Sequence, residues 1–385
     1  MYRFVTRIVL PVLCFAAPSF GQSASPLHTP LRVGIVGLVH GHVHGFLGQY
    51  RHSPEIEIVG IAEPDQRLLS QAGVRYGFDQ AILFTSLEKM IAKTHPQAVL
   101  VYTNTFDHRR IVETCARLGV HVMMEKPLAV SFEDALAIEK AARAGNIHVL
   151  VNYETSWYRS NHAVYDLVHE GTIGEVRKVV VQVGHKGPKE IGVEPEFLAW
   201  LTDPRLNGGG ALFDFGCYGA DLMTWLMDGE RPVTVTAVTQ HIKAEIYARV
   251  DDEATVVLTY PKAQAIIQAS WNWPFGRKDM AVYGQTGSVI TVQRDDIRVR
   301  RGGDDRNLEE QVAAKALPAP YDNELGYLRA VIVDGFKEDK VSSLDTNVTA
   351  TEILDAARRS ATEGKTIRLP EKNSKHVILS ATNAP

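Results

Sequence analysis

Residues 31–45, LRVGIVGLVHGHVHG, decide the fold of this chain. Residues 31–36 are almost entirely apolar and predict a short buried strand. Gly37 then begins a turn that enters a helix through Gly41. In a dinucleotide-binding fold such a turn presents backbone N–H groups to a pyrophosphate at the start of the helix. The stretch therefore predicts a strand–turn–helix unit that either binds a nucleotide or is an ordinary structural connection.

The glycine spacing of this turn is incomplete. Val39 stands at the second glycine position of G-x-G-x-x-G, and His42 stands at the third. A second predicted strand, at 56–62, ends at Glu63. An acid at that point accepts hydrogen bonds from the adenosine ribose hydroxyls and would repel the 2′-phosphate of NADP. Glu63 therefore predicts NAD as the preferred cofactor, with NADP as the alternative.

Strands and helices continue to alternate after this unit. Strands are predicted at 98–102, 120–124 and 149–151, with a helix at about 107–118 between the first two. Ser131 opens a capping box for the next helix, and Gly145 is expected to end it. Repeated units of this length predict an α/β fold with a doubly wound parallel sheet.

Polar residues follow two of these strands. Asn104 follows the strand at 98–102, and Glu125 and Lys126 follow the strand at 120–124. Ligands of such sheets lie beyond the carboxyl ends of the strands. Pro127 restricts Lys126 to an extended backbone and so fixes where its side chain leaves the chain. A surface lysine beside a turn proline is the alternative interpretation.

Taken together, the motifs resemble one family. The chain is similar to the glucose-fructose oxidoreductase and inositol dehydrogenase family (Gfo/Idh/MocA) from about residue 31 to 370. The shared markers are Val33-Gly34-Ile35-Val36-Gly37, His108 ahead of a helix, Glu125-Lys126-Pro127-Leu128-Ala129, Gly171-Thr172-Ile173-Gly174-Glu175-Val176, Gly208-Gly209-Gly210 and Gly364-Lys365. The resemblance implies hydride transfer at a sugar or cyclitol carbon by an NAD(P)-dependent enzyme.

The resemblance also implies a domain plan. It places a Rossmann domain at 31–152 and a second α/β domain at 153–372, built on an open, mostly antiparallel sheet, before a tail at 373–385. Sheets of this kind often pair between subunits, so a homo-oligomer is expected. Strands in the second domain are predicted at 176–183, 233–239, 254–259, 265–271, 281–283 and 289–292, and helices at 161–170, 324–337 and 346–363.

The catalytic lysine of the family falls on Lys126, and its Asp-x-x-x-His pair falls on Asp214 and Tyr218, so tyrosine replaces histidine. Tyrosine also occurs there in two branches of the family. Val39 for a glycine and Asn104 for the usual proline are further departures, and they put cofactor affinity in doubt.

The same three residues can be read chemically. Oxidation of a secondary alcohol needs a base for the hydroxyl proton. A tyrosine with a pKa near 10 is a poor base, but a nearby ammonium such as Lys126 favours its phenolate. Asp214, Tyr218 and Asp221 are four and three residues apart, which predicts one helix face. A capping aspartate and an amphipathic tyrosine are the alternative.

The remaining site residues are expected around this centre. The cofactor is expected to contact Gly37, Val39, His40, Gly41, His42, Glu63, Asn104, His108, Glu125 and Lys126. Substrate contacts are expected among Lys186, Trp200, Arg205, Asp221 and Trp271, with His185, Asp203 and Asn207 as further candidates from a long Gly- and Pro-rich connection. Trp271 and Trp273 share a face at period two and could form a sugar platform, core packing or a dimer interface.

Three histidines, at 40, 42 and 44, raise the question of a metal. His40 and His44 could share a face, but no neighbouring Cys or carboxylate completes a ligand set. The expectation is therefore no metal, with the histidines lining the cleft or adding polarity at a helix end.

Composition and the N-terminus bear on location. A net charge of −4 on 385 residues gives no electrostatic footprint for nucleic acid. Arg3 and Arg7 precede an apolar run at 8–17, which resembles a secretory signal within residues 1–22 that is cleaved near Gly21. The run is too short to span a membrane, so no integral span is expected after cleavage. A periplasmic or secreted protein is predicted.

Export limits access to free NAD and leaves three classes of function open. The chain could be an oxidoreductase that holds its cofactor tightly, a redox-assisted NAD-dependent glycosidase or lyase, or a sugar-binding protein without turnover.

Overall fold

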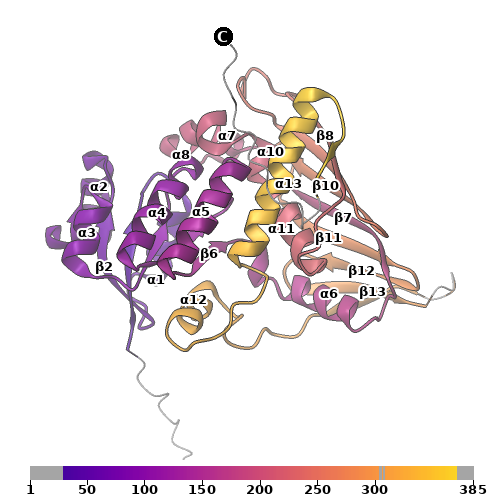
Figure 1. Cartoon of the computed structure of the whole chain (residues 1–385), viewed down its shortest axis with the longest axis horizontal. Helices are drawn as coiled ribbons and strands as arrows, with labels where there is room; N and C mark the ends of the chain where they lie inside the picture. The colour runs from indigo at the N-terminus through magenta and orange to yellow at the C-terminus, as the bar shows by residue number, and fades with distance from the viewer. Residues whose placement is uncertain (1–28, 303–305, 307, 371–385) are drawn as a thin grey trace, which may run out of the picture.

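The protein is described by a computed structural model that covers residues 29–302, 306 and 308–370. The predicted leader and the tail at 373–385 lie outside the described residues. Two sheets dominate the structure, and they stand beside each other with helices packed around and between them (Figure 1).

The first sheet is parallel throughout, as the sequence predicts. Its strand order is β3-β2-β1-β4-β5-β6, in which the order reverses beside β1. The strands are β1 (Leu31–Val36), β2 (Ile56–Ala62), β3 (Leu83–Phe84), β4 (Ala98–Val101), β5 (His121–Glu125) and β6 (Val149–Asn152). The near-continuous burial of β1, β4 and β5 is typical of strands covered on both faces.

Helices cover this sheet. They are α1 (His42–Tyr50), α2 (Gln66–Tyr76), α3 (Leu87–Thr94), α4 (His108–Leu118) and α5 (Phe132–Gly145). Ser131 caps α5 by accepting the N–H of Asp134 at 3.1 Å, as predicted. The expected stop at Gly145 is displaced by one residue, because Asn146 takes the left-handed conformation instead. Gly145 is needed for packing, since a Cβ there would lie 2.4 Å from the carbonyl oxygen of Ala116.

The second sheet has nine strands in the order β14-β13-β12-β11-β7-β10-β9-β8-β15. Neighbouring strands of this sheet run antiparallel except β10 and β7, which confirms the expected mostly antiparallel sheet. The strands are β7 (Val176–Gly184), β8 (Thr234–Gln240), β9 (Glu253–Thr259), β10 (Gln264–Ser270), β11 (Arg277–Gly284), β12 (Gly287–Val292), β13 (Asp296–Arg301), β14 (Glu310–Ala313) and β15 (Ile367–Arg368).

The helices after β6 join the two halves. They are α6 (Arg159–His169), α7 (Pro188–Ile191), α8 (Pro195–Leu201), α9 (Pro204–Asn207), α10 (Ala211–Asp214), α11 (Gly216–Leu226), α12 (Glu324–Ile332) and α13 (Leu344–Glu363). The α13 helix packs on α5 of the first half and on α11 and β8 of the second (Figure 1). Short helices α7, α8 and α9 occupy the long connection that follows β7. Among the described residues, no helix is both long enough and apolar enough to cross a membrane.

Candidate active site

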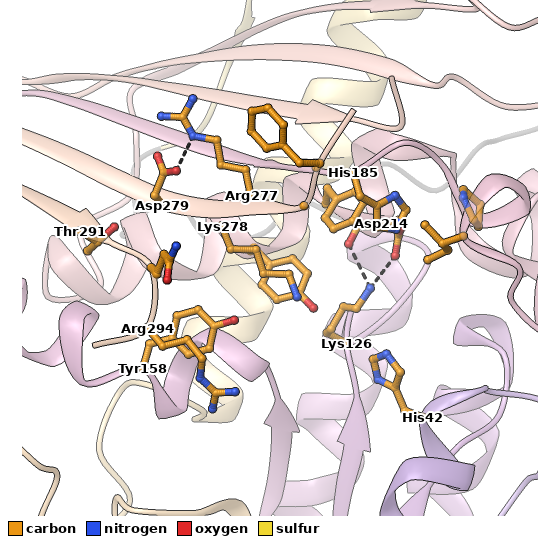
Figure 2. Close-up of a pocket in the computed structure, with 18 of the residues that line it drawn as sticks. His42, Lys126, Tyr158, His185, Asp214, Arg277, Lys278, Asp279, Thr291 and Arg294 are labelled. Atoms are coloured by element: carbon orange, nitrogen blue, oxygen red, sulfur yellow. Dashed lines mark hydrogen bonds and ion pairs between the residues drawn. The ribbon is translucent and has the colours of Figure 1, made fainter. Parts of the chain in front are cut away.

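Lys126 and Asp214 meet where the two halves of the molecule face each other. Lys126 follows β5 directly, and its Nζ donates to Asp214 Oδ1 at 2.6 Å and to the Asp214 carbonyl oxygen at 3.0 Å (Figure 2). The other carboxylate oxygen, Oδ2, accepts the indole N–H of Trp271 at 2.9 Å. All three side chains are buried. The fold thus brings together two residues that stand 88 positions apart in the chain.

The pair keeps its charges despite burial. Burial alone would lower the pKa of Lys126, but the Asp214 carboxylate raises it above its ordinary value. Burial alone would raise the pKa of Asp214, but the Lys126 ammonium and the hydrogen bond to it hold that pKa below its ordinary value. The site therefore contains a charged ammonium group that is held by the Asp214 carboxylate.

Tyr218 lies on α11 beside this pair, but its surroundings differ from the prediction. Lys126 Nζ is 5.3 Å from the centroid of the Tyr218 ring, and Lys278 Nζ is 4.8 Å from it. Burial raises the pKa of Tyr218 well above its ordinary value, and Lys278 is the main cation acting against that rise. The expectation that Lys126 favours the phenolate is therefore wrong. Burial keeps Tyr218 a neutral phenol, and Lys126 is engaged by Asp214.

The predicted single helix face is also wrong. The α10 helix ends at Asp214, and α11 begins at Gly216 after Phe215. Asp214 reaches the site from the end of one helix, and Tyr218 reaches it from the first turn of the next.

A cavity of about 980 Å³ opens around these groups. Lys126, Asp214 and Tyr218 line it together with His42, and the second sheet supplies much of the opposite wall (Figure 2). Other polar residues of its wall are Tyr158, His185, Glu194, Arg277, Lys278, Asp279, Thr291, Gln293, Arg294, Arg298 and Gln311. Sequence reasoning missed most of these residues, because strand alternation identifies a face without identifying what covers it.

His185 faces this cavity with a defined hydrogen-bonding role. The backbone N–H of Gly187 donates to His185 Nδ1 at 2.9 Å, so a neutral ring carries its proton on Nε2. Burial lowers the pKa of His185, although Asp214 opposes the change. The neutral imidazole is therefore a donor toward the cavity, as expected of a candidate substrate contact.

The five residues predicted to contact substrate do not line this cavity. Trp271 and Asp221 are fully buried, which corrects their assignment, and Trp271 is a core residue rather than a sugar platform. Trp200 is also buried, and its indole N–H donates to the Val39 carbonyl at 3.1 Å. Lys186 and Arg205 are exposed and are absent from the cavity wall; Arg205 pairs with Asp203.

The turn after β1 has the backbone that the sequence predicts. Gly37 has a φ of +86°, and a Cβ there would lie 2.5 Å from the Thr103 side chain, so only glycine fits. Four N–H groups between Gly37 and His42 are already donated within the chain. That of Gly37 reaches the Ala62 carbonyl at 2.8 Å, and those of Leu38, His40 and His42 reach Glu63 Oε2 at 2.7 Å, the Tyr102 carbonyl at 3.1 Å and His40 Nδ1 at 3.3 Å. The turn N–H groups that could meet a pyrophosphate are therefore those of Val39 and Gly41.

Glu63 is turned inward. Its two carboxylate oxygens accept the N–H groups of Leu38 and Asp65, and its side chain is 4% exposed. Burial raises its pKa. The expected contact with the ribose hydroxyls is therefore not prepared, because both oxygens already bind the backbone.

Space for a dinucleotide nevertheless runs past the turn. A second cavity, of about 590 Å³, is lined by Leu38, Val39, His44 and residues of α2. It shares Gly41 and Glu194 with the larger cavity that holds Lys126. A dinucleotide that occupied both spaces would pass Gly41, where the nearby Glu194 carboxylate would repel a phosphate unless it moved.

Two other expected cofactor residues shape the site from behind. Asn104 accepts the N–H of Asp107 at 3.0 Å and donates to its carboxylate at 2.9 Å, so it caps the turn before α4. His108 is buried, and its Nδ1 lies 3.1 Å and 3.2 Å from the carbonyl oxygens of Pro127 and Leu128. His108 thus holds the segment that follows Lys126.

Glu125 changes the interpretation of the histidines. Its Oε2 lies 3.1 Å from His42 Nδ1 and 4.0 Å from His40 Nε2. The expectation that no carboxylate completes a set with these histidines is wrong, because the fold supplies one from the end of β5. His44 points elsewhere, with its Nδ1 2.9 Å from the hydroxyl of Tyr76.

Comparison with known proteins agrees with this architecture. Residues 31–153 match the family model described as "Oxidoreductase family, NAD-binding Rossmann fold", and residues 161–290 match the GFO/IDH/MocA C-terminal domain. Among solved structures, an inositol dehydrogenase homolog from Azotobacter vinelandii complexed with NAD+ superposes with a TM-score of 0.76 at 18% identity, covering 90% of this chain and 99% of that one. The aldose-aldose oxidoreductase from Caulobacter crescentus gives 0.74 at 24% identity, covering 88% and 100%.

Curated relatives have similar coverage. The scyllo-inositol 2-dehydrogenase (NADP+) of Bacillus subtilis is 22% identical over 361 residues, which cover 88% of this chain and 96% of the relative. The trans-1,2-dihydrobenzene-1,2-diol dehydrogenase of Xenopus tropicalis is 25% identical over 313 residues, which cover 78% and 88%. The chain therefore belongs to the GFO/IDH/MocA family of NAD(P)-dependent oxidoreductases.

Proposed function

We propose that this protein transfers a hydride between NAD(P) and a secondary alcohol carbon of a sugar or cyclitol. The observation that carries the proposal is the buried Lys126–Asp214 pair, which lines a large polar cavity at the carboxyl end of β5. The bound nicotinamide would supply or accept the hydride. The Lys126 ammonium would hydrogen-bond the reacting oxygen and stabilise negative charge on it.

The neutral phenol of Tyr218 suits a role in the proton transfer. It can give a proton to the oxygen of a ketone that is being reduced, and the phenolate left behind takes the proton back in the reverse oxidation. Burial disfavours that phenolate in both directions, and the Lys278 ammonium opposes this effect. His185 Nε2–H and the cationic side chains of Arg277 and Arg294 would bind other hydroxyl groups of the same substrate.

Substitutions at the two central residues test these roles. Lys126→Ala and Tyr218→Phe should each slow the chemical step by about 10²-fold or more, the usual effect of removing a positioned acid or base. Calorimetric titration should show that both variants keep binding NAD(H). Tyr165→Phe is the matched control, because Tyr165 bonds Asp228 at an exposed position outside the cavity. Full turnover by both site variants on a verified substrate would refute the assignment, and failure to bind any dinucleotide would favour a sugar-binding protein.

We propose NAD(H) as the preferred cofactor. The proposal rests on Asp65, the exposed N-cap residue of α2, whose carboxyl group lies just beyond the end of β2, where a 2′-phosphate would meet it. Parallel titrations with NAD(H) and NADP(H) test this preference. Equal or tighter NADP(H) binding would refute it.

We also propose export and self-association. The proposal of export rests on the leader-like residues 1–22, and fractionation with N-terminal sequencing tests it. Self-association through the second sheet is supported by exposed apolar side chains on its strands, such as Val238 and Tyr283. Sedimentation analysis should then show a species larger than one chain.

A further inference from the structure

We propose that His40, His42 and Glu125 bind a divalent transition-metal ion at the edge of the cavity that contains Lys126. One ring nitrogen of each histidine and one oxygen of Glu125 all lie within 4.8 Å of one another. Two imidazoles and one carboxylate form a common donor set for zinc sites that leave a coordination position open.

The fold creates this cluster. His40 lies in the turn between β1 and α1 and His42 is the first residue of α1, whereas Glu125 is the last residue of β5. Both positions lie at the carboxyl edge of the parallel sheet, where the ligands of such folds bind. Phe197 and Trp200 pack against the His40 ring, with centroids 4.4 Å and 5.5 Å away.

The distances suit an ion after a small adjustment. Zinc bonds of about 2.0–2.2 Å to nitrogen and oxygen place tetrahedral ligand atoms about 3.3 Å apart. The pair of His42 Nδ1 and Glu125 Oε2, at 3.1 Å, already has this separation. His40 Nε2, at 4.0 Å from the same oxygen, would move inward and give up the 3.3 Å bond that Nδ1 accepts from the His42 N–H.

His108 provides a second, independent observation. Its Nδ1 faces two carbonyl oxygens, so that nitrogen carries the proton and Nε2 is left with a lone pair. This Nε2 is buried and has no hydrogen-bond partner among the residues that the structure describes. His108 contacts the carbonyl oxygens of the residues two and three positions after Glu125, which places its ring near that ligand. Water bound to a metal ion would offer the missing donor.

The open coordination positions would face substrate. The His42 side chain is 53% exposed and lines the same cavity as Lys126, on the side of Lys126 away from Asp214 (Figure 2). An ion there would take oxygen ligands from a polyol, such as two neighbouring hydroxyl groups. The polyol as a ligand of the ion rests on the proposed function. Binding of the ion itself does not, because it is measured without turnover.

Titration of the full-length protein tests the site. Chelator-treated protein is titrated with Zn²⁺ by calorimetry and with Co²⁺ by visible absorption, which reports the ligand geometry. We expect one ion per chain. Loss of a residue that only hydrogen-bonds a metal ligand typically weakens metal affinity by about 10–100-fold. His42→Ala and Glu125→Gln each remove a ligand itself, so each should weaken Zn²⁺ binding by at least about 100-fold. His44→Ala should bind Zn²⁺ as wild type does, because His44 lies two residues after His42 in α1 but bonds Tyr76.

The outcomes separate the two proposals. A wild-type protein that fails to bind Zn²⁺, or a His42→Ala variant that binds it unchanged, would overturn the metal site. The exposed side chain of His42 makes that variant decisive even if Glu125→Gln fails to fold. Zn²⁺ binding without NAD(H) binding would refute the proposed function and support the metal site. NAD(H) binding without Zn²⁺ binding would refute the metal site and leave the proposed function standing.

Discussion

Asp214 and Asp221 are seven residues apart, and both are buried, yet their surroundings are opposite. Asp214 meets the Lys126 ammonium and the Trp271 indole, and these partners hold its pKa below the ordinary value. Asp221 has no hydrogen-bond partner for either oxygen among the described residues, and burial raises its pKa well above the ordinary value. Burial thus favours a neutral acid unless a specific partner pays for the charge. Only the paired aspartate lines the cavity.

Removing the Lys126 ammonium beside Asp214 should have the largest effect on the free energy of unfolding. Lys126→Ala leaves the Asp214 carboxylate buried beside a vacated cation site, which should lower the free energy of unfolding by about 3–5 kcal/mol. Urea unfolding at neutral pH measures the change. The matched control is Arg143→Ala, because Arg143 pairs with Asp345 through a side chain that is 65% exposed. An exposed pair contributes at most about 1 kcal/mol, so equal losses in the two variants would contradict the buried-charge argument.

The indole bond should have the next largest effect. Trp271→Phe removes one donor to a charged acceptor and should cost about 1.5–3 kcal/mol for the hydrogen bond. Trp157→Phe is the matched control, because its indole donates to the neutral amide oxygen of Asn152 at 2.8 Å and should cost about 1 kcal/mol. Unfolding of both variants under one condition gives the comparison, and a smaller loss for Trp271→Phe would show that Asp214 needs only Lys126.

Local patterns predicted most of the fold. The strand at 31–36, the cap at Ser131 and the alternating strands of the second sheet depend on neighbouring residues, and the structure has them within a few positions. The helix expected at 324–337 is shorter, because it gives way to a turn at Gly335, whose φ is +69°. Such boundaries depend on backbone conformations that periodicity does not report.

The site was predicted less completely, because its contacts join distant segments. Lys126 and Asp214 were found through motifs, and the structure brings them together. Glu125 was expected to contact a cofactor, but its approach to two histidines 83 and 85 positions earlier leaves no local signal. Spacing also placed Asp221 in the site, and it could not show that the side chain points into the core.

Asp221→Asn should change stability in the opposite direction, and its effect should vanish near pH 4. The unfolded chain loses the Asp221 proton above about pH 4, whereas the folded chain keeps it because the pKa is raised. The folded state then binds more protons, so stability falls as pH rises from about 4 toward the folded pKa. The slope is at most about 1.4 kcal/mol per pH unit. The charged neighbour acting on Asp221 is Asp339, while Tyr153 and Cys217 stay neutral because burial raises their pKa values.

Asp221→Asn carries no titrating proton, so it should be more stable than wild type at neutral pH, and the gain should shrink as pH falls toward 4. Urea unfolding at several pH values between 4 and 8 measures the slope. Asp228→Asn is the control with the reverse sign. Burial raises the pKa of Asp228, but its bonds to Lys340, His169 and Tyr165 outweigh burial and hold the pKa below the ordinary value. The contribution of Asp228 to stability is therefore lost as pH falls. If Asp221→Asn left the pH slope unchanged, Asp221 would have to be ionised in the folded chain, and the contrast with Asp214 would disappear.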